Sequence, residues 1–332
     1  MPAPDPPKKR ARLRFREHPL EFLLGAFAEV RPGEAPTVLL LALNVFLLLT
    51  AYYLLKVARE PLILLGSGAE VKSYASVGQS ILLVFVASGY GWLSARVGRM
   101  ALITTVTLFF AANLVVFWAL GERDVPLGIP FFLWVGVFNT VTVAQFWSFA
   151  ADTYTEERGK RLFPIVGIGS SIGAVGGATV AEPLVKRGSP FLLMLIAAGI
   201  LVVSLALTFV VNRREVGGEK KAGEEKPHEE ALGRGNAFAL IVRDRYLLVF
   251  AVLIFVLNMV TKTGDYVLDR MLVSKAASAA QALGVEPAVY IGEFKARYFE
   301  WINALGVVMQ LFVVSRVIKY AGLRLALLLV PL

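Results

Sequence analysis

The chain has 332 residues, of which 57% are hydrophobic and 18% are charged, and its formal net charge is +9. An average globular chain has about 45–50% apolar and about 25% charged residues, so this composition indicates a protein surrounded by lipid. The absence of cysteine excludes disulfides, iron–sulfur clusters and thiolate zinc sites. The two histidines, His18 and His228, both lie in hydrophilic segments. We therefore expect neither a metal site nor a cofactor.

The apolar residues form runs that are long enough to cross a bilayer as helices. A membrane helix needs about 20 residues to cross about 30 Å of hydrocarbon, where lipid satisfies no backbone polar group. We predict eight spans, at Pro36–Val57, Ser73–Ala95, Met100–Leu120, Ile129–Ala151, Leu162–Leu184, Pro190–Val211, Tyr246–Val267 and Phe299–Ile318. A ninth apolar run begins near Leu323 and stops at Leu332, too soon to cross the bilayer. The sequence is therefore expected to be the larger part of a longer protein.

Lysine and arginine in the short loops predict the orientation, because these residues accumulate on the cytoplasmic side of a membrane. Residues 1–35 form a basic leader, in which the short apolar stretch Leu20–Phe27 is interpreted as an interfacial helix. If the spans alternate in direction, the remaining basic clusters lie on the same side as the leader: Arg96 and Arg99, then Arg158, Lys160 and Arg161, then Arg213 and Arg214, then Arg316 and Lys319. We predict a multi-pass inner-membrane protein with a cytoplasmic N terminus. Anionic lipid headgroups account for the positive charge, so no nucleic-acid partner is expected.

A hydrophilic segment, residues 212–244, divides the chain and is the predicted cytoplasmic linker. Residues 212–244 are rich in charge and glycine, and they separate six predicted spans in residues 36–211 from the start of a second half in residues 245–332. A long cytoplasmic connection after six spans is typical of the major facilitator architecture. The predicted fold class is therefore an all-α membrane protein with a major-facilitator-type helix bundle, of which about eight or nine of about twelve spans are present.

Charged side chains near the predicted membrane interior are the first candidates for function, because each costs about 2.5–3.5 kcal/mol at the centre of a helix. One group closes the first span, and another follows one face of the seventh. The first group is Lys56, Arg59 and Glu60, and the second is Asn258, Lys262, Asp265 and Asp269. These residues either bind a substrate in a central cavity or extend to lipid headgroups and pair with neighbouring acids.

Glycines recur in the fifth predicted span. Gly169, Gly173 and Gly177 are spaced every four residues, which is the pattern of small residues that lets two membrane helices approach closely. The spacing does not fit a dinucleotide-binding loop, and no strand precedes it. The sequence also lacks a phosphate-binding loop of the ATPase type and any nucleophile–base set, so we expect a protein that is not an enzyme.

Two segments carry a resemblance to a known family. Tyr52–Tyr74, reading YYLLKVAREPLILLGSGAEVKSY, and Phe146–Gly177, reading FWSFAADTYTEERGKRLFPIVGIGSSIGAVGG, resemble the nucleotide transporters of plastids and obligate intracellular bacteria. Tyr290–Val314 is a third, looser match. In place of the family's aspartate after the first basic residue, this chain has Glu60-Pro61.

The resemblance implies a facilitator-type antiporter that exchanges ATP for ADP and binds the phosphates with cationic residues. By position, Lys56 or Arg59 is the cation of the first helix, and Glu157 or Asp152 is the acid of the fourth. The corresponding charge in the second half is Asp265 or Lys262, with Asn258 one turn earlier.

The sequence thus predicts a transporter that works by alternating access on an anionic small molecule, with a nucleotide as the leading substrate. One alternative is a proton-coupled facilitator for another organic anion, in which Asp265 or Asp269 carries the proton. A second alternative is a membrane sensor or scaffold that transports nothing, in which the leader and the linker bind partners.

Overall fold

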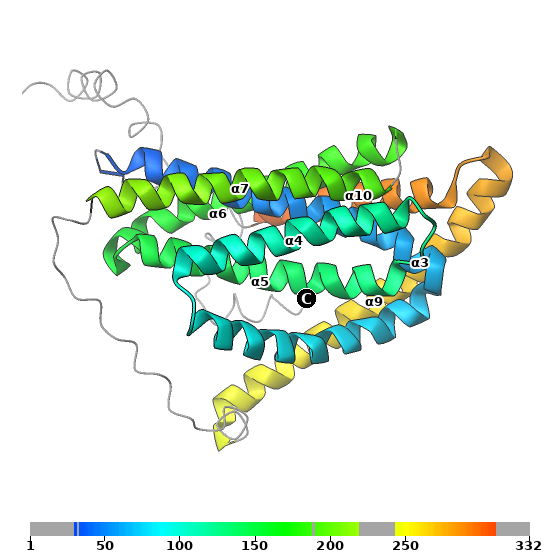
Figure 1. Ribbon diagram of the computed structural model, residues 1–332. Coiled ribbons are helices and arrows are strands. Elements are labelled where there is room, and N and C mark those ends of the chain that lie inside the picture. The colour runs from blue at the N-terminus through cyan, green and yellow to red at the C-terminus, as the bar shows by residue number, and fades with distance from the viewer. Residues whose placement is uncertain (1–29, 32, 188–189, 219–242, 310–332) are drawn as a thin grey trace, which may run out of the picture.

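The computed structural model describes residues 30–31, 33–187, 190–218 and 243–309. The predicted interfacial helix, most of the predicted linker and the apolar run after Leu323 lie outside these residues. The described part contains helices and no strand, and Figure 1 shows the helices as one elongated bundle. The helices are α3 (Ala35–Ser94), α4 (Arg99–Gly121), α5 (Gly128–Thr153), α6 (Glu156–Arg187), α7 (Pro190–Gly218), α9 (Arg245–Leu283) and α10 (Pro287–Val308).

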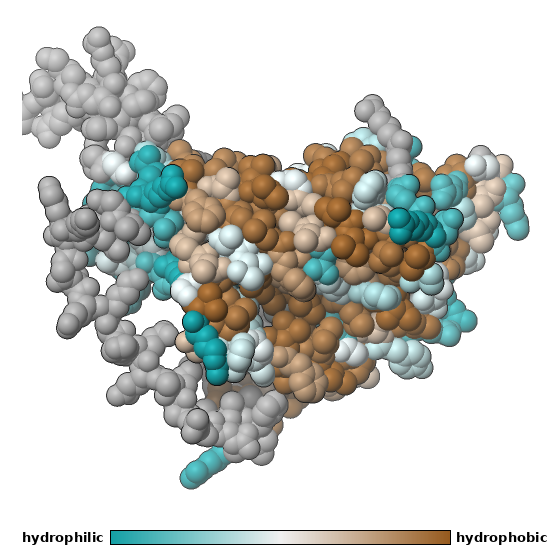
Figure 2. Space-filling view, in the orientation of Figure 1, coloured by the Kyte–Doolittle hydropathy of each residue, from teal (hydrophilic) through white to brown (hydrophobic). Residues whose placement is uncertain are grey.

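Six of these helices, α3 to α7 and α9, are long and apolar enough to cross a membrane. Large apolar side chains cover much of their outer surface, including Phe85 on α3 and Phe255 on α9, which are both exposed. Figure 2 shows an apolar belt across the face of the bundle, with most hydrophilic side chains towards its two ends. The prediction of an all-α, multi-pass membrane protein is confirmed.

The first two predicted spans are two helical arms that follow one another across a sharp turn, in place of the long loop that was predicted between them. Residues 58–72, predicted to lie in that loop, are helical except at Gly68, where φ is 85° and ψ is 168°. A residue without a Cβ atom adopts this positive φ without steric cost. The chain turns back there (Figure 1), so α3 has a first arm, residues 35–67, and a second arm, residues 69–94. We call the end of the bundle near this turn the Gly68 end and the opposite end the Glu34 end.

The helices after the linker also differ from the prediction. The seventh span was predicted to end at Val267, whereas α9 continues to Leu283. The eighth was predicted to begin at Phe299, whereas α10 already begins at Pro287. Hydropathy placed these boundaries where charged residues interrupt the apolar runs, but the charged residues are accommodated within the helices.

The first arm of α3 is the centre of the bundle and packs against α5, α6 and α7. Close approach to α6 depends on Gly169, Gly173 and Gly177, because a Cβ atom at each of them would collide with the backbone of the first arm. At Gly177 that atom would lie 2.8 Å from the carbonyl oxygen of Thr50. Buried hydrogen bonds join the first arm to α7, where Asn44 Nδ2 donates to Thr208 Oγ1 at 2.8 Å.

We predict that Gly173→Leu impairs folding, because its side chain would displace the Phe46 backbone in a dense helix interface. Overpacking a well-packed core costs about 1–3 kcal/mol, and a backbone collision adds to this. The measurement is the yield and melting temperature of detergent-solubilised protein by fluorescence-detected gel filtration. Gly199→Leu is the matched control, since a Cβ atom at this exposed glycine of α7 meets nothing within 4 Å. A Gly173→Leu protein as stable as the control would contradict the packing role.

The Glu34 end is closed by ion pairs among helix termini. Glu34, just before α3, accepts hydrogen bonds from Arg161 at 3.0 Å and from Arg158 at 3.2 Å, both on α6. Arg158 also lies 3.8 Å from Glu215 on α7. Burial opposes ionisation of Glu34, but its bonds to Arg161 and to the Arg31 backbone N–H, with the charge of Arg158, hold its pKa below the ordinary value of 4.5.

We predict that Glu34→Gln lowers the melting temperature at neutral pH, and that its effect shrinks as the pH falls below 4.5. A carboxyl group with a lowered folded-state pKa stabilises the fold above its unfolded-state pKa, and that stabilisation is lost on acidification through the folded-state value. Melting curves across this pH range provide the measurement. Glu156→Gln is the control, because the Glu156–Lys160 pair is largely exposed and such surface pairs contribute little to stability. A difference that stays constant with pH would argue against the ionic role.

Candidate functional site

A cluster of charged side chains lies inside the bundle near the Gly68 end. We call Arg59, Glu60, Lys72, Asp269 and Lys295 the ionic cluster. Glu60 lies 2.9 Å from Arg59 and 2.5 Å from Lys72. Asp269 lies 2.6 Å from Lys72 and 2.5 Å from Lys295. Lys295 also approaches Glu60 at 3.4 Å, which closes the network.

The turn at Gly68 explains how this cluster forms. Arg59 and Glu60 lie on the first arm of α3, whereas Lys72 begins the second arm, so the reversal of the chain brings Lys72 back onto Glu60. Asp269 comes from α9 and Lys295 from α10. The cluster therefore joins helices that precede the linker to helices that follow it.

The two carboxylates of the cluster are almost inaccessible, since the side chain of Glu60 is 1% exposed and that of Asp269 is 2% exposed. Burial of an ionised carboxylate is tolerated only when cations and hydrogen bonds replace its water. Here three cations surround two carboxylates, and each carboxylate contacts at least two of the cations. The cluster thus carries one positive charge in excess.

A cavity of about 820 Å³ lies between the second arm of α3 and α9. We call it the junction cavity. Lys72 and Asp269 are part of its lining, and Lys72 is the more accessible of the two, with 13% of its side chain exposed against 2%. Ser73, Ser76 and Ser80 continue along the wall formed by the second arm. The predicted residues Asn258, Lys262 and Asp265 line the facing wall on α9.

Lys262 and Asp265 are brought together, with 3.9 Å between the ammonium nitrogen and a carboxylate oxygen. Both side chains are accessible, so this pair is weak compared with the buried contacts of Lys72. Asn258 donates to the carbonyl oxygen of Ile254 in its own helix. These three predicted residues therefore share one cavity with part of the ionic cluster.

Lys56 lies outside the cavity and faces aromatic rings. Its ammonium nitrogen is 4.0 Å from the ring centre of Phe299 on α10 and 5.0 Å from that of Tyr53. Tyr53 in turn donates a hydrogen bond of 2.8 Å to Asn303 on α10. Within the described residues, no carboxylate lies within ion-pair distance of Lys56, so ring faces stabilise its charge. Arg59, by contrast, belongs to the ionic cluster.

The other two predicted residues lie elsewhere. Glu157 begins α6 at the Glu34 end and pairs with Arg31 at 3.2 Å. Asp152 ends α5 at the same end and pairs with Arg99 at 3.2 Å. Glu34 and Lys56 are separated along α3 by about 33 Å of helix, at 1.5 Å per residue. Glu157 and Asp152 therefore do not form one site with the cations of the Gly68 end.

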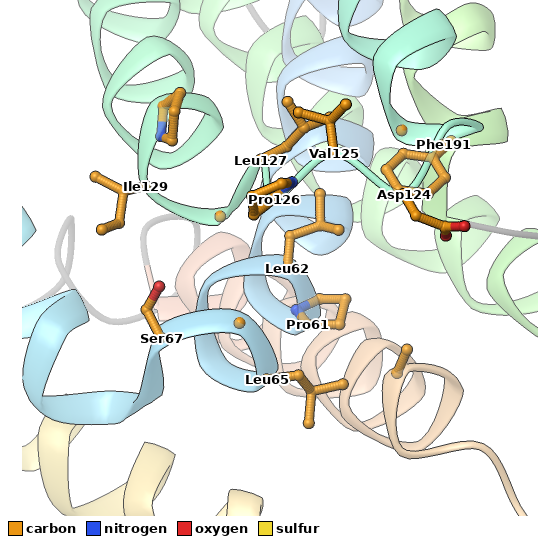
Figure 3. A pocket seen from close by; sticks show the side chains of 15 residues that line it. Pro61, Leu62, Leu65, Ser67, Asp124, Val125, Pro126, Leu127, Ile129 and Phe191 are labelled. Carbon is orange, nitrogen blue, oxygen red and sulfur yellow. The ribbon is translucent and has the colours of Figure 1, made fainter.

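A second cavity, of about 450 Å³, lies at the Gly68 end beside the turn of α3. Its lining is mostly hydrocarbon from Pro61, Leu62 and the α4–α5 loop (Figure 3). The side-chain oxygens in Figure 3 belong to Ser67 and Asp124. With one acid and no cation in its lining, this cavity is less suited than the junction cavity to binding a charged solute.

Around the junction, positive charge exceeds negative charge. Arg270 extends the set, since it donates to the Tyr266 hydroxyl, which reaches Glu70. The cations near the junction are Lys56, Arg59, Lys72, Lys262, Arg270 and Lys295. The carboxylates are Glu60, Glu70, Asp265 and Asp269. The six cations outnumber the four carboxylates by two.

Sequence reasoning did not select Lys72 or Lys295 as site residues. Both were predicted to lie in loops beside spans, where a lysine is ordinarily solvated. The signal that could have found them is Glu60, an acid within an apolar stretch that requires buried cations somewhere in the fold. The sequence gives no indication of which lysines those are.

No family model matches the chain, and no curated protein and no solved structure matches it.

We predict that Asp269→Leu destabilises the protein by about 3–5 kcal/mol, because it leaves Lys295 and Lys72 without one of their acids in the interior. Adding Lys295→Met should recover part of the loss, since Glu60 then retains Arg59 and Lys72 as partners. Thermal melting of the two single variants and the double variant measures the coupling.

The control for this cycle is the accessible pair, changed to Lys262→Met and Asp265→Leu, for which coupling below about 1 kcal/mol is expected. Strictly additive losses for Asp269 and Lys295 would argue against a shared buried network.

Proposed function

We propose that this protein is an inner-membrane transporter that exchanges anionic nucleotides, ATP against ADP, by alternating access, with lysine and arginine binding the phosphates. The observation that carries the proposal is the excess of cations at the junction of α3, α9 and α10. The buried and half-buried groups there are four cations, Lys56, Arg59, Lys72 and Lys295, and three carboxylates, Glu60, Asp265 and Asp269. An interior with more cations than carboxylates attracts an anion, because unneutralised charge is costly at low dielectric.

The form of the junction cavity supports a small-molecule substrate. Binding cavities for small molecules are about 300–1,000 Å³, and the junction cavity has a volume of about 820 Å³. Its lining includes the ammonium groups of Lys72 and Lys262, which suit phosphate oxygens, and the hydroxyls of Ser73 and Ser76, which here donate to carbonyl oxygens of their own helix. Aromatic side chains such as Tyr74 and Phe255 line the same space and offer ring faces to a nucleobase.

The arrangement around the linker supports alternating access in a major-facilitator-type bundle of twelve spans. Helices that precede the linker meet α9 and α10 at the ionic cluster, which is how two halves of such a transporter enclose a site. Basic residues at the Glu34 end, including Arg31, Arg99 and Arg158, support a cytoplasmic position for that end. The resemblance of Tyr52–Tyr74 and Phe146–Gly177 to nucleotide transporters points to the substrate.

The test is uptake of radiolabelled ATP into liposomes that contain the purified full-length protein and are loaded with ADP. Saturable uptake that requires internal ADP, and that external ADP chases out, is the expected result. Uptake of another organic anion driven by a pH gradient would instead favour the proton-coupled alternative. Verified insertion without transport of any tested anion would favour a sensor or scaffold.

We predict that Lys56→Ala and Lys262→Ala each abolish ATP uptake without preventing membrane insertion, since each removes a cation from the junction. Insertion is measured by surface labelling and gel filtration, and uptake by the liposome assay. Lys160→Ala is the matched control, because this lysine is exposed at the opposite end of the bundle and pairs with Glu156. Normal uptake by both junction variants would remove these lysines from the proposed site.

A further inference from the structure

Lys72 differs from the other cations of the ionic cluster in its surroundings. It contacts both carboxylates, at 2.5 Å to Glu60 and 2.6 Å to Asp269. It also lines the junction cavity, which neither Arg59 nor Lys295 does. Lys72 is therefore the cation of this cluster that a solute in the cavity can reach.

The cluster can lose Lys72 without leaving a buried carboxylate unpaired. Glu60 would keep Arg59 at 2.9 Å and Lys295 at 3.4 Å. Asp269 would keep Lys295 at 2.5 Å. Two cations would then balance two carboxylates, so the remainder of the cluster would be electrically neutral. Removal of Lys295 would leave the same balance of charge, with Lys72 as the remaining cation on Asp269, but Lys295 is only 3% exposed and does not line the cavity, so a solute there does not reach it.

From this geometry we infer that Lys72 is the phosphate-binding residue of the junction cavity. When a phosphate group enters, the Lys72 ammonium group exchanges its contacts with Glu60 and Asp269 for contacts with the phosphate. This inference rests on the proposed function, and it names a residue that sequence reasoning left out. The exchange replaces two carboxylate contacts with contacts to phosphate oxygens, so the ammonium group remains paired throughout.

The transfer also has a mechanical consequence. The contact between Lys72 and Asp269 joins the second arm of α3 to α9. When a phosphate holds Lys72, that link is released, whereas Asp269 remains attached to α10 through Lys295. Substrate binding therefore loosens one side of the cavity and keeps the other side fixed, which couples occupancy to movement of the second arm.

Lys72→Met is the first variant to test, because methionine keeps an unbranched apolar side chain and removes the charge. We expect it to fold with a melting temperature near that of the unmodified protein, and to bind ATP about 10- to 100-fold more weakly, as for loss of a charged hydrogen bond. The measurement is the ATP-induced shift in melting temperature at increasing ATP concentration. Lys72→Arg should restore most of the shift, whereas Lys262→Arg in the Lys72→Met protein should not.

A second measurement does not depend on stability. The chain has no cysteine, so a single cysteine introduced at Ser76 can be labelled with a maleimide. Ser76 lies one turn from Lys72 and lines the same cavity, so bound ATP or tripolyphosphate should slow its labelling. Ser88→Cys is the control, because Ser88 is exposed on the second arm and is not among the residues that line the cavity. In the Lys72→Met background the protection of Ser76→Cys should disappear.

The outcomes separate the two proposals. Protection and melting shifts that vanish with Lys72→Met and return with Lys72→Arg support the assignment. If the melting-temperature shift and the protection from labelling persist in the Lys72→Met protein, the assignment of Lys72 is overturned and the transport proposal is left intact. If ATP, ADP and tripolyphosphate neither raise the melting temperature of the unmodified protein nor slow the labelling of Ser76→Cys, both the assignment of Lys72 and the proposed anion site are overturned.

Discussion

The structure around the Gly68 end depends on the need to neutralise two carboxylates inside an apolar bundle. Glu60 and Asp269 lie on helices that are far apart in the sequence, and neither can contact enough water to stay ionised alone. Their cations come from three further positions, Arg59, Lys72 and Lys295. Satisfying both acids at once therefore requires the reversal of α3 at Gly68 and the close approach of α9 and α10.

Holding helices together with such a cluster costs free energy, because its charges must be removed from water. Replacing a buried ionic network by apolar side chains of similar volume is often neutral or stabilising, so the network is weak evidence for a stabilising role. The tight interface between α6 and the first arm of α3 shows that this chain forms close helix contacts without buried charges, through glycines, apolar side chains and one hydrogen bond from Thr50 to the Gly173 carbonyl. This contrast supports the proposal that the charges at the Gly68 end bind an ion and exchange partners, which apolar contacts cannot do.

Local sequence features predicted the parts of the fold that depend on local chemistry. Long apolar runs gave the membrane helices, and the spacing of Gly169, Gly173 and Gly177 gave a small-residue face that the structure places against α3. Asn258, Lys262 and Asp265 were selected from their common helical face, and they line one cavity. Charged residues caused the errors in the predicted helix boundaries, because a lysine in an apolar stretch lowers the hydropathy and is read as the end of a helix.

The ionic cluster could not be assembled from the sequence, because its pairs join residues that a single sequence does not relate. Glu60 and Lys295 occur in different halves of the chain, and only the folded bundle brings them together. Glu157 and Asp152 illustrate the opposite case. They were selected by resemblance alone, and their ion pairs belong to the Glu34 end, where they join neighbouring helix termini.

The two ends of the bundle differ in what their ion pairs connect. At the Glu34 end the pairs join α3, α6 and α7, which all precede the linker. At the Gly68 end they cross to the helices after the linker, through the ionic cluster and through Glu182 on α6, which lies 2.9 Å from Arg297 on α10. In Figure 1 the starts of α3 and α9 lie well apart on the same side of the view.

Among the described residues, the ion pairs that cross between the helices before and after the linker lie at the Gly68 end; under the proposed function this corresponds to a carrier that is closed on that side of the membrane. With the Glu34 end in the cytoplasm, as proposed, the closed side is the outside. Opening it requires the crossing contacts to break, including those of Lys295 and Arg297. The release of Lys72 by a substrate would remove one of these contacts and leave the pairs at the Glu34 end unchanged, because those pairs lie within a single half.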